Sequence, residues 1–286
     1  MKNGDRGSRY DLPVNRLSAV AAVLILTQSG TALAQNPSPL PEWVYSAGAP
    51  VMRRFMDEIP TWRVILGASV EVLPKYDGSH KYRILAGPMF DIRYKELAFL
   101  ATGEGLGVNF FHNDYVRTGL AITYDLGRSP TLANELNRLG DVDPTPEAKL
   151  FGELVLFPVV LRANVRRAMG GYNGWAGDFG AYLPIAGTKR LFIFAGPGLS
   201  FGDQNYMQRY FGITEAEADA SGYPVYTPSG GAKAVSFAVT ATWLMGNHWF
   251  LNLTGAGDCL LNDADDSPTT QNRVQGIASF TIAYRF

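Results

Sequence analysis

The sequence predicts an all-β fold, a transmembrane antiparallel β-barrel of about 12 strands, with a range of 10 to 14 left open. The composition is the first indication. Charged residues make up only 18%, against roughly 25% in globular proteins, while the chain holds 31 Gly and 12% aromatic residues. The second indication is an alternation of apolar and polar residues along many segments, up to the last residue. The third is an alternation of short turns with long loops, which is typical of membrane barrels.

The charge balance and the cysteine count exclude several classes of protein. With 25 Lys+Arg against 26 Asp+Glu, the 286-residue chain has a net charge of -1, so it lacks the positive field of a nucleic-acid binder. Its one cysteine, Cys259, excludes an internal disulfide and a multi-cysteine metal site. We interpret Cys259 as a small, buried apolar residue of a strand.

The N-terminus, residues 1–34, has the three parts of a cleaved signal peptide. A basic start is followed by an 11-residue apolar run, 17–27, and by the small residues Ala32 and Ala34 before the expected cleavage site. The run is too short to cross a bilayer, which takes about 20 residues. The alternative interpretation is a buried helix of the mature domain.

The mature chain is predicted to be an arm followed by one domain. Residues 35–60 show no clear alternation and are interpreted as a periplasmic N-terminal arm or plug segment. Residues 61–286 are predicted to form the outer-membrane barrel. Its first strand begins at Trp62, and from there apolar residues alternate with polar ones.

The last segment, 271–286, shows the alternation most clearly. Successive side chains of a strand point to opposite faces, so one face of this segment is apolar and the other polar. The apolar face ends on four large side chains at period two: Phe280, Ile282, Tyr284 and Phe286. This ending resembles the C-terminal assembly signature of bacterial outer-membrane proteins, which the barrel-assembly machinery reads. The alternative is the last strand of a soluble sandwich.

Charged residues keep to one phase of the predicted strands. In a membrane barrel this phase must face the lumen, because Arg or Lys facing lipid at mid-bilayer costs about 2–4 kcal/mol. One interpretation is a mildly cationic pore that selects anionic solutes, and the other is a closed lumen braced by arginine–carboxylate pairs. The candidate lumen residues are Arg63, Glu71, Arg83, Asp91, Arg93, Arg117, Asp125, Glu153, Arg162, Arg166 and Asp178.

The connections alternate in length as a barrel requires. Short turns are predicted at 112–114, 157–158, 186–189 and 245–247, and long loops at 128–147, 203–230 and 262–270. If the C-terminus is periplasmic, the long loops are all extracellular. Residues 96–111 have two interpretations, which are two short strands around Gly103–Gly105 or one long strand with a glycine kink.

Five strings carry a resemblance to a known family. They are PKYDGS at 74–79, YDLGR at 124–128, YMQRYFG at 206–212, SGYPVY at 221–226 and DADDSP at 263–268. Together with the terminal phenylalanine, they resemble the MipA/OmpV family over roughly residues 60–286. One departure is Asp265, where a small residue is expected.

The resemblance implies an outer-membrane β-barrel of a Gram-negative bacterium. The family's named member is a scaffold that bridges a murein lytic transglycosylase and a penicillin-binding protein, and other members are described as porin-like or as adhesins. The resemblance therefore implies a peptidoglycan scaffold. Its expected partners are those two enzymes, outer-membrane lipid and the barrel-assembly machinery. The alternative is a narrow porin-like channel for small anionic solutes.

Three further features of the sequence are candidate sites. The loop 203–230 carries five aromatic residues, which are Tyr206, Tyr210, Phe211, Tyr223 and Tyr226. One interpretation is that they form a contact surface or an inward-folded constriction. The other is that the loop packs on itself over the barrel mouth. Asp263, Asp265 and Asp266 match a calcium loop poorly and are interpreted as a solvated acidic loop. With three histidines and neither a GxSxG nor an HExxH motif, we expect no enzyme, no cofactor and no metal.

Overall fold

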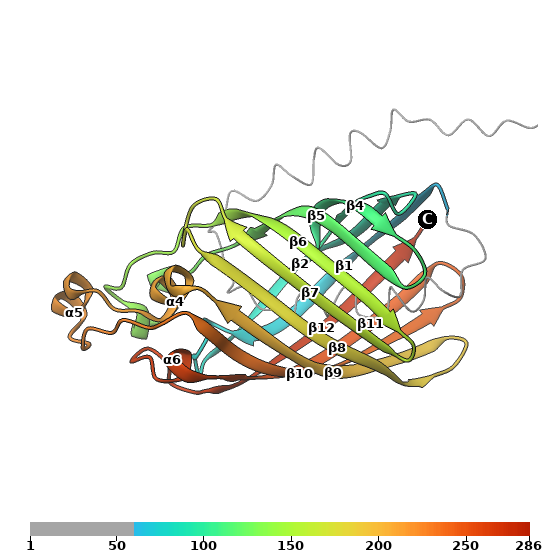
Figure 1. The fold of residues 1–286 in the computed structure, drawn as a ribbon. Helices are drawn as coiled ribbons and strands as arrows, with labels where there is room; N and C mark the ends of the chain where they lie inside the picture. Colours follow the sequence, from blue (N-terminus) through green and yellow to red (C-terminus); the bar gives the residue numbers. More distant parts are fainter. Residues whose placement is uncertain (1–59) are drawn as a thin grey trace, which may run out of the picture. The chain divides into compact units, whose positions relative to one another are not determined.

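The computed structural model describes residues 60–286, so the predicted signal peptide and nearly all of the predicted arm lie outside the described residues. Twelve antiparallel strands close into a barrel in which each strand pairs with its neighbours in sequence and β1 pairs with β12 (Figure 1). The strand number agrees with the predicted twelve. The strands are β1 Trp62–Pro74, β2 Tyr82–Tyr94, β3 Ala98–Ala101, β4 Gly105–His112, β5 Val116–Asp125, β6 Thr145–Leu156, β7 Val159–Ala168, β8 Trp175–Gly187, β9 Leu191–Gly202, β10 Gly231–Met245, β11 Trp249–Leu260 and β12 Val274–Arg285.

The predicted alternation sets which face of each strand points outward. On β12, Gln275, Ser279 and Thr281 are buried in the lumen, while Phe280 and Ile282 are exposed on the outside. The other long strands follow the same rule, so the outer surface is apolar and the lumen holds nearly all the charged side chains of the strands. This is the arrangement that lipid demands of a spanning strand.

The two ends of the barrel differ. The turn end carries the short connections after β4, β6, β8 and β10 together with the C-terminus, and the loop end carries the long connections after β5, β9 and β11. The turns and loops lie within a few residues of their predicted positions. Figure 1 shows the α-helices at the loop end, away from the C-terminus.

The helices in the long loops are features that the strand analysis did not predict. They are the 3-10 turns η2 Pro130–Leu132 and η3 Asn134–Leu136, and the α-helices α4 Gln204–Phe211, α5 Glu215–Ser221 and α6 Asn262–Asp265. Side chains cap two of them, because Asp203 accepts from the Tyr206 amide and Thr214 forms a capping box with Glu217. Among residues 60–286, no helix is both long and apolar enough to cross a membrane.

The segment 96–111 forms two short strands, as the first of the two interpretations states. β3 and β4 make a hairpin whose turn contains Gly103 and Gly105, with φ of 86° and 90°. A Cβ on Gly105 would lie 2.2 Å from the Ile122 carbonyl oxygen, so the position requires glycine. The hairpin is shorter than β2, and it pairs with β2 only over residues 91–94.

Candidate functional site in the barrel lumen

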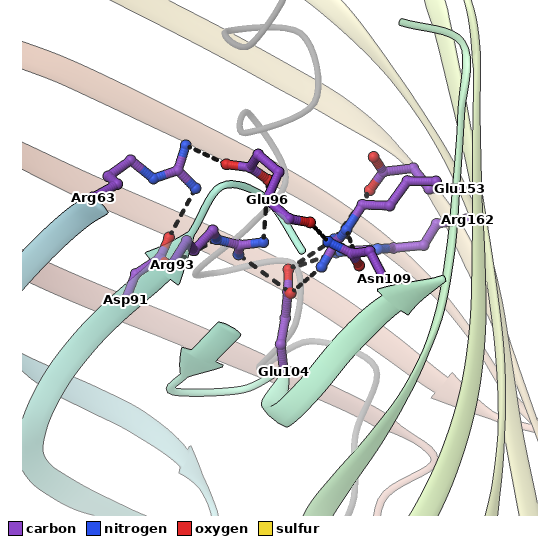
Figure 2. A network of polar contacts seen from close by, with 9 residues as sticks. Arg63, Asp91, Arg93, Glu96, Glu104, Asn109, Glu153 and Arg162 are labelled. Atoms are coloured by element: carbon purple, nitrogen blue, oxygen red, sulfur yellow. Dashed lines mark hydrogen bonds and ion pairs between the residues drawn. The ribbon is translucent and has the colours of Figure 1, made fainter. Parts of the chain in front are cut away.

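A network of charged side chains in the lumen is centred on one carboxylate, that of Glu104 (Figure 2). Its oxygens lie 3.2 Å from Arg93 Nη2 on β2, 2.8 Å from Arg117 Nη2 on β5 and 3.0 Å from Arg162 Nη2 on β7. Glu104 comes from the glycine-flanked turn of the β3–β4 hairpin and is 3% exposed. The turn therefore places a carboxylate where it pairs with arginines of β2 on one side and of β5 and β7 on the other.

The network continues on both sides of Glu104. On the β1 side, the Arg63 guanidinium lies 3.5 Å from Asp91 and 3.3 Å from Glu96, and Arg93 Nε donates to Asp91 at 2.7 Å. On the β7 side, Arg162 Nη2 lies 3.4 Å from a Glu153 oxygen. The result is a continuous line of ion pairs from β1 to β7.

Aromatic rings lie against two arginines of the network, Arg93 and Arg117. The Arg117 guanidinium carbon lies 5.0 Å from the ring centroid of Phe99 and 4.8 Å from that of Phe151, and Arg93 lies 5.3 Å from Phe99. Rings at this distance attract a cation and keep water away from it. The ion pairs consequently act in a medium of low dielectric constant, where they are stronger than at a surface.

The network is electrically balanced. Four arginines, Arg63, Arg93, Arg117 and Arg162, meet four carboxylates, Asp91, Glu96, Glu104 and Glu153. Strand periodicity did not point to Glu96 or Glu104, because both lie in turns. The glycines on either side of Glu104 were the one available signal of a tight inward turn.

A second charged cluster lies nearer the loop end. Arg166 on β7 pairs with Asp178 on β8, and its Nε lies 3.3 Å from Glu147 on β6. The hydroxyl of Tyr172 donates to Glu147. Arg166 was among the predicted lumen residues, and Glu147 was not.

Helix α4 packs over the lumen at the loop end. Tyr206, Met207, Tyr210 and Phe211 are buried in one cluster with the strand-end residues Ala168, Ala176, Ala234 and Leu260. The rings of Tyr172, Tyr206 and Tyr210 lie 4.7 to 6.0 Å apart. Three of the five predicted loop aromatics thus lie in the packed cluster.

Polar contacts fix α4 to the barrel rim. The Tyr210 hydroxyl donates to Asp125 at 2.8 Å, and Arg128 Nη1 donates to the Tyr210 carbonyl at 2.6 Å. Burial, reinforced by the Asp125 carboxylate, raises the pKa of Tyr210 well above its ordinary value, so the hydroxyl stays protonated and donates. The remaining loop aromatics, Tyr223 and Tyr226, are partly buried against the segment 132–139.

The other predicted site residues occupy varied places. Arg83 faces the lumen from β2 but lies outside both charged clusters, and His80 contacts Gln271 at the rim. Asp263 accepts from the Ser229 amide at 2.6 Å, and Asp265 lies 3.4 Å from Arg273. Cys259 is only half-buried and lies in the outward phase of β11, so the prediction of a buried cysteine is wrong.

The residues of the predicted C-terminal assembly signature lie on the outside of β12. Phe280, Ile282 and Phe286 are exposed, and the Tyr284 ring packs against His248, Trp249 and Phe286. Exposed rings at the margin of a membrane barrel are typical of an interfacial girdle.

Comparisons with known proteins agree with this architecture. The family model described as MltA-interacting protein MipA matches residues 66–286. Outer membrane protein OmpV of Vibrio cholerae serotype O1 is 24% identical over 234 residues, which is 79% of this chain and 86% of that protein.

Solved structures resemble the chain only distantly. The translocator domain of the autotransporter NalP from Neisseria meningitidis aligns with a TM-score of 0.43 and 10% identity, over 86% of this chain and 99% of the domain. The COG4313 outer membrane channel from Pseudomonas putida F1 aligns with a TM-score of 0.39 and 8% identity, over 80% of this chain and 97% of that one. The family match and the closed barrel together establish that the chain is an outer-membrane β-barrel belonging to the MipA family.

Proposed function

We propose that this protein is a closed barrel that holds murein-remodelling enzymes at the outer membrane, and that it acts without catalysis. The observation that carries the proposal is a set of contacts inside the lumen and at its loop-end mouth. Ion pairs centred on Glu104 link β1 to β7, and α4 packs over the loop-end mouth. The description of the matching family as MltA-interacting supports a murein lytic transglycosylase as one partner.

The proposal includes an orientation, with the turn end in the periplasm and the loop end outside. Membrane barrels have short periplasmic turns and longer extracellular loops, and the two ends of this barrel differ in that way. A periplasmic enzyme would then meet only the turn end or the residues before β1.

An aromatic patch at the turn end is the surface that we propose for docking. The register of β4 against β5 shifts between Asn109 and Phe111, so Phe110 and Phe111 are both exposed where a regular strand would bury one of them. The exposed residues of this patch are Phe110, Phe111, Tyr115, Leu156 and Phe157. Aromatic residues are enriched at the energetic centres of protein interfaces.

The test is binding of a purified murein lytic transglycosylase to the barrel in detergent. Phe111→Ala with Tyr115→Ala should weaken binding at least tenfold, as expected for the loss of two aromatic anchors. The control is Phe237→Ala, which removes an equally exposed ring from the middle of β10. Equal affinities for the patch variant and the wild type would contradict this docking surface, and no binding to the wild type would contradict the scaffold.

The second candidate function is the narrow channel. The wall formed by β10, β11 and β12 lies outside the ion-pair line. Its middle is lined by uncharged polar side chains, among them Thr240, Asn252, Thr254 and Thr281, and the charged Lys233 and Asp258 lie nearer the loop end. Uncharged polar side chains of this kind can line a narrow path for water and small solutes. A channel predicts stepwise conductance whose ion selectivity changes with Arg162→Glu and Arg166→Glu.

A further inference from the structure

The hydrogen-bond ladder of the barrel has a gap between β2 and β5. On the side away from β1, β2 pairs with β3 only over residues 91–94, so residues 82–90 have no partner strand there among the described residues. On the facing side, β4 pairs with β5 only as far as Ile122, which leaves 123–125 paired with β6 alone. We call this interval the ladder gap.

Other parts of the chain frame the ladder gap. Its lower border is the β3–β4 turn, where the Thr102 amide donates to the Phe90 carbonyl at 2.9 Å and Thr102 Oγ1 accepts from the Phe90 amide at 3.0 Å. Its upper border is the loop after β5, which reaches the β1–β2 connection. There Lys81 Nζ lies 2.7 Å from Glu135, and Tyr76 packs against Leu136.

The free edge of β2 carries backbone groups that need partners. Because Phe90 bonds toward Thr102, the alternate residues Ile84, Ala86 and Pro88 turn their backbone groups to the same side. Pro88 has no amide hydrogen, which is a common way to protect a strand edge. Ile84 and Ala86 do have amide hydrogens, and an open strand edge is not tolerated in hydrocarbon without a partner.

A buried cation stands beside this edge. All three guanidinium nitrogens of Arg83 are shielded from solvent, and none has a hydrogen-bond partner within residues 60–286. No carboxylate of the described residues forms an ion pair with it. A buried charge without a partner is costly, so the site is suited to an anion that is supplied from outside the chain.

The exposed aromatic and apolar side chains near Arg83 indicate that the anion belongs to a lipid. Tyr82 and Tyr124 are exposed at the loop-end margins of β2 and β5, where interfacial aromatic residues mark the level of lipid headgroups. Below them, Ile84, Leu106 and Ile122 expose apolar side chains around the ladder gap. On the lumen face of β2, a Cβ added at Gly87 would meet no heavy atom within 4 Å, so there is room behind the edge.

We propose that the ladder gap binds one lipid of the outer leaflet through its phosphate headgroup. The phosphate oxygens accept hydrogen bonds from the Arg83 guanidinium and from the free amides of β2, and an acyl chain covers the apolar side chains below. The placement in the outer leaflet rests on the orientation proposed above. The inference otherwise goes beyond the scaffold function, since it needs no murein enzyme.

The test is native mass spectrometry of the detergent-solubilised protein titrated with dihexanoyl phosphatidic acid. One molecule should bind per barrel, and Arg83→Gln should weaken binding at least tenfold, because hydrogen bonds to charged groups are the strong ones. Arg190→Gln, which removes an exposed arginine from the turn end, is the matched control and should leave binding unchanged. Equal binding by Arg83→Gln and the wild type would overturn the proposal.

Two further measurements distinguish a bound lipid from a free anion and from a polypeptide. Inorganic phosphate should bind at least a hundredfold more weakly than the lipid, and equal affinity would reveal a site for a free anion instead. A photo-reactive residue at position 84 should capture a phosphate-bearing lipid of the outer leaflet from native membranes. Capture of a polypeptide there would show that strand addition fills the gap and would refute lipid binding.

If Arg83→Gln fails to fold, Arg83→Met supplies the readout. Without added lipid, it should raise the urea midpoint of unfolding, because it removes an unpaired buried charge. A lowered midpoint would show that Arg83 already has a stabilising role in the lipid-free barrel and would contradict the proposal.

Discussion

Replacing Glu104 by glutamine tests the ion-pair network directly. The substitution keeps the size of the side chain but removes the charge that faces Arg93, Arg117 and Arg162, all of which are buried. At an effective dielectric constant of about 20, two unit charges about 4 Å apart attract by about 4 kcal/mol. The cost of burying the carboxylate offsets much of the total, and removing one partner of a buried pair typically costs about 3–5 kcal/mol.

We therefore expect Glu104→Gln to lower the free energy of unfolding by about 3–5 kcal/mol. The assay is urea unfolding in lipid vesicles, followed by the heat-dependent gel mobility of the folded barrel. The control is Asp265→Asn, which breaks the rim pair with Arg273, whose side chain is 55% exposed, and should cost far less because exposed pairs contribute little. A Glu104→Gln loss no larger than that of the control would refute the network as a brace.

Two other predictions concern the loop end. Burial acts to raise the pKa of Glu217, but hydrogen bonds from Thr214 and Gly140 bring it below its ordinary value, and the bond with Lys81 lowers the pKa of Glu135 to about 2. A depressed pKa adds stability above the unfolded value of 4.5 that is lost as the pH falls through the folded value. Hydrogen-exchange protection of segments 126–144 and 213–222 should thus decrease as the pH falls from about pH 5 to pH 2, and unchanged protection would contradict these contacts. Tyr210→Phe should cost about 1–3 kcal/mol, because it leaves the buried Asp125 carboxylate short of a donor, while Tyr223→Phe should change the urea midpoint little.

The strands could be predicted from sequence because lipid imposes a period-two pattern on them. Charged residues such as Arg117 and Arg162 fall in the lumen phase, and outward residues such as Phe280 fall in the other. The period-two pattern could not predict that Glu96 and Glu104 face the lumen. They belong to turns, where side-chain direction depends on backbone dihedral angles and not on alternation.

The helices of the loops left signals that a strand analysis ignores. Thr214 followed by Glu217 fits a capping box, and the apolar residues Tyr206, Met207, Tyr210 and Phe211 recur at helical spacing. The packing of α4 over the lumen depends on contacts far apart in sequence, such as Tyr210 with Asp125. Those contacts follow from barrel closure, which no local pattern specifies.

Single-channel recording is the measurement that tests the closed-barrel account most directly. The chain from residue 35 onward is refolded, shown by heat-dependent gel mobility to be inserted in lipid, and fused into a planar bilayer of the same lipid. Because ion pairs inside the lumen link β1 to β7 and α4 packs at the loop-end mouth, we predict that the inserted barrel passes no stepwise current. Regular conductance steps from the wild-type protein would contradict the closed lumen and favour the narrow channel.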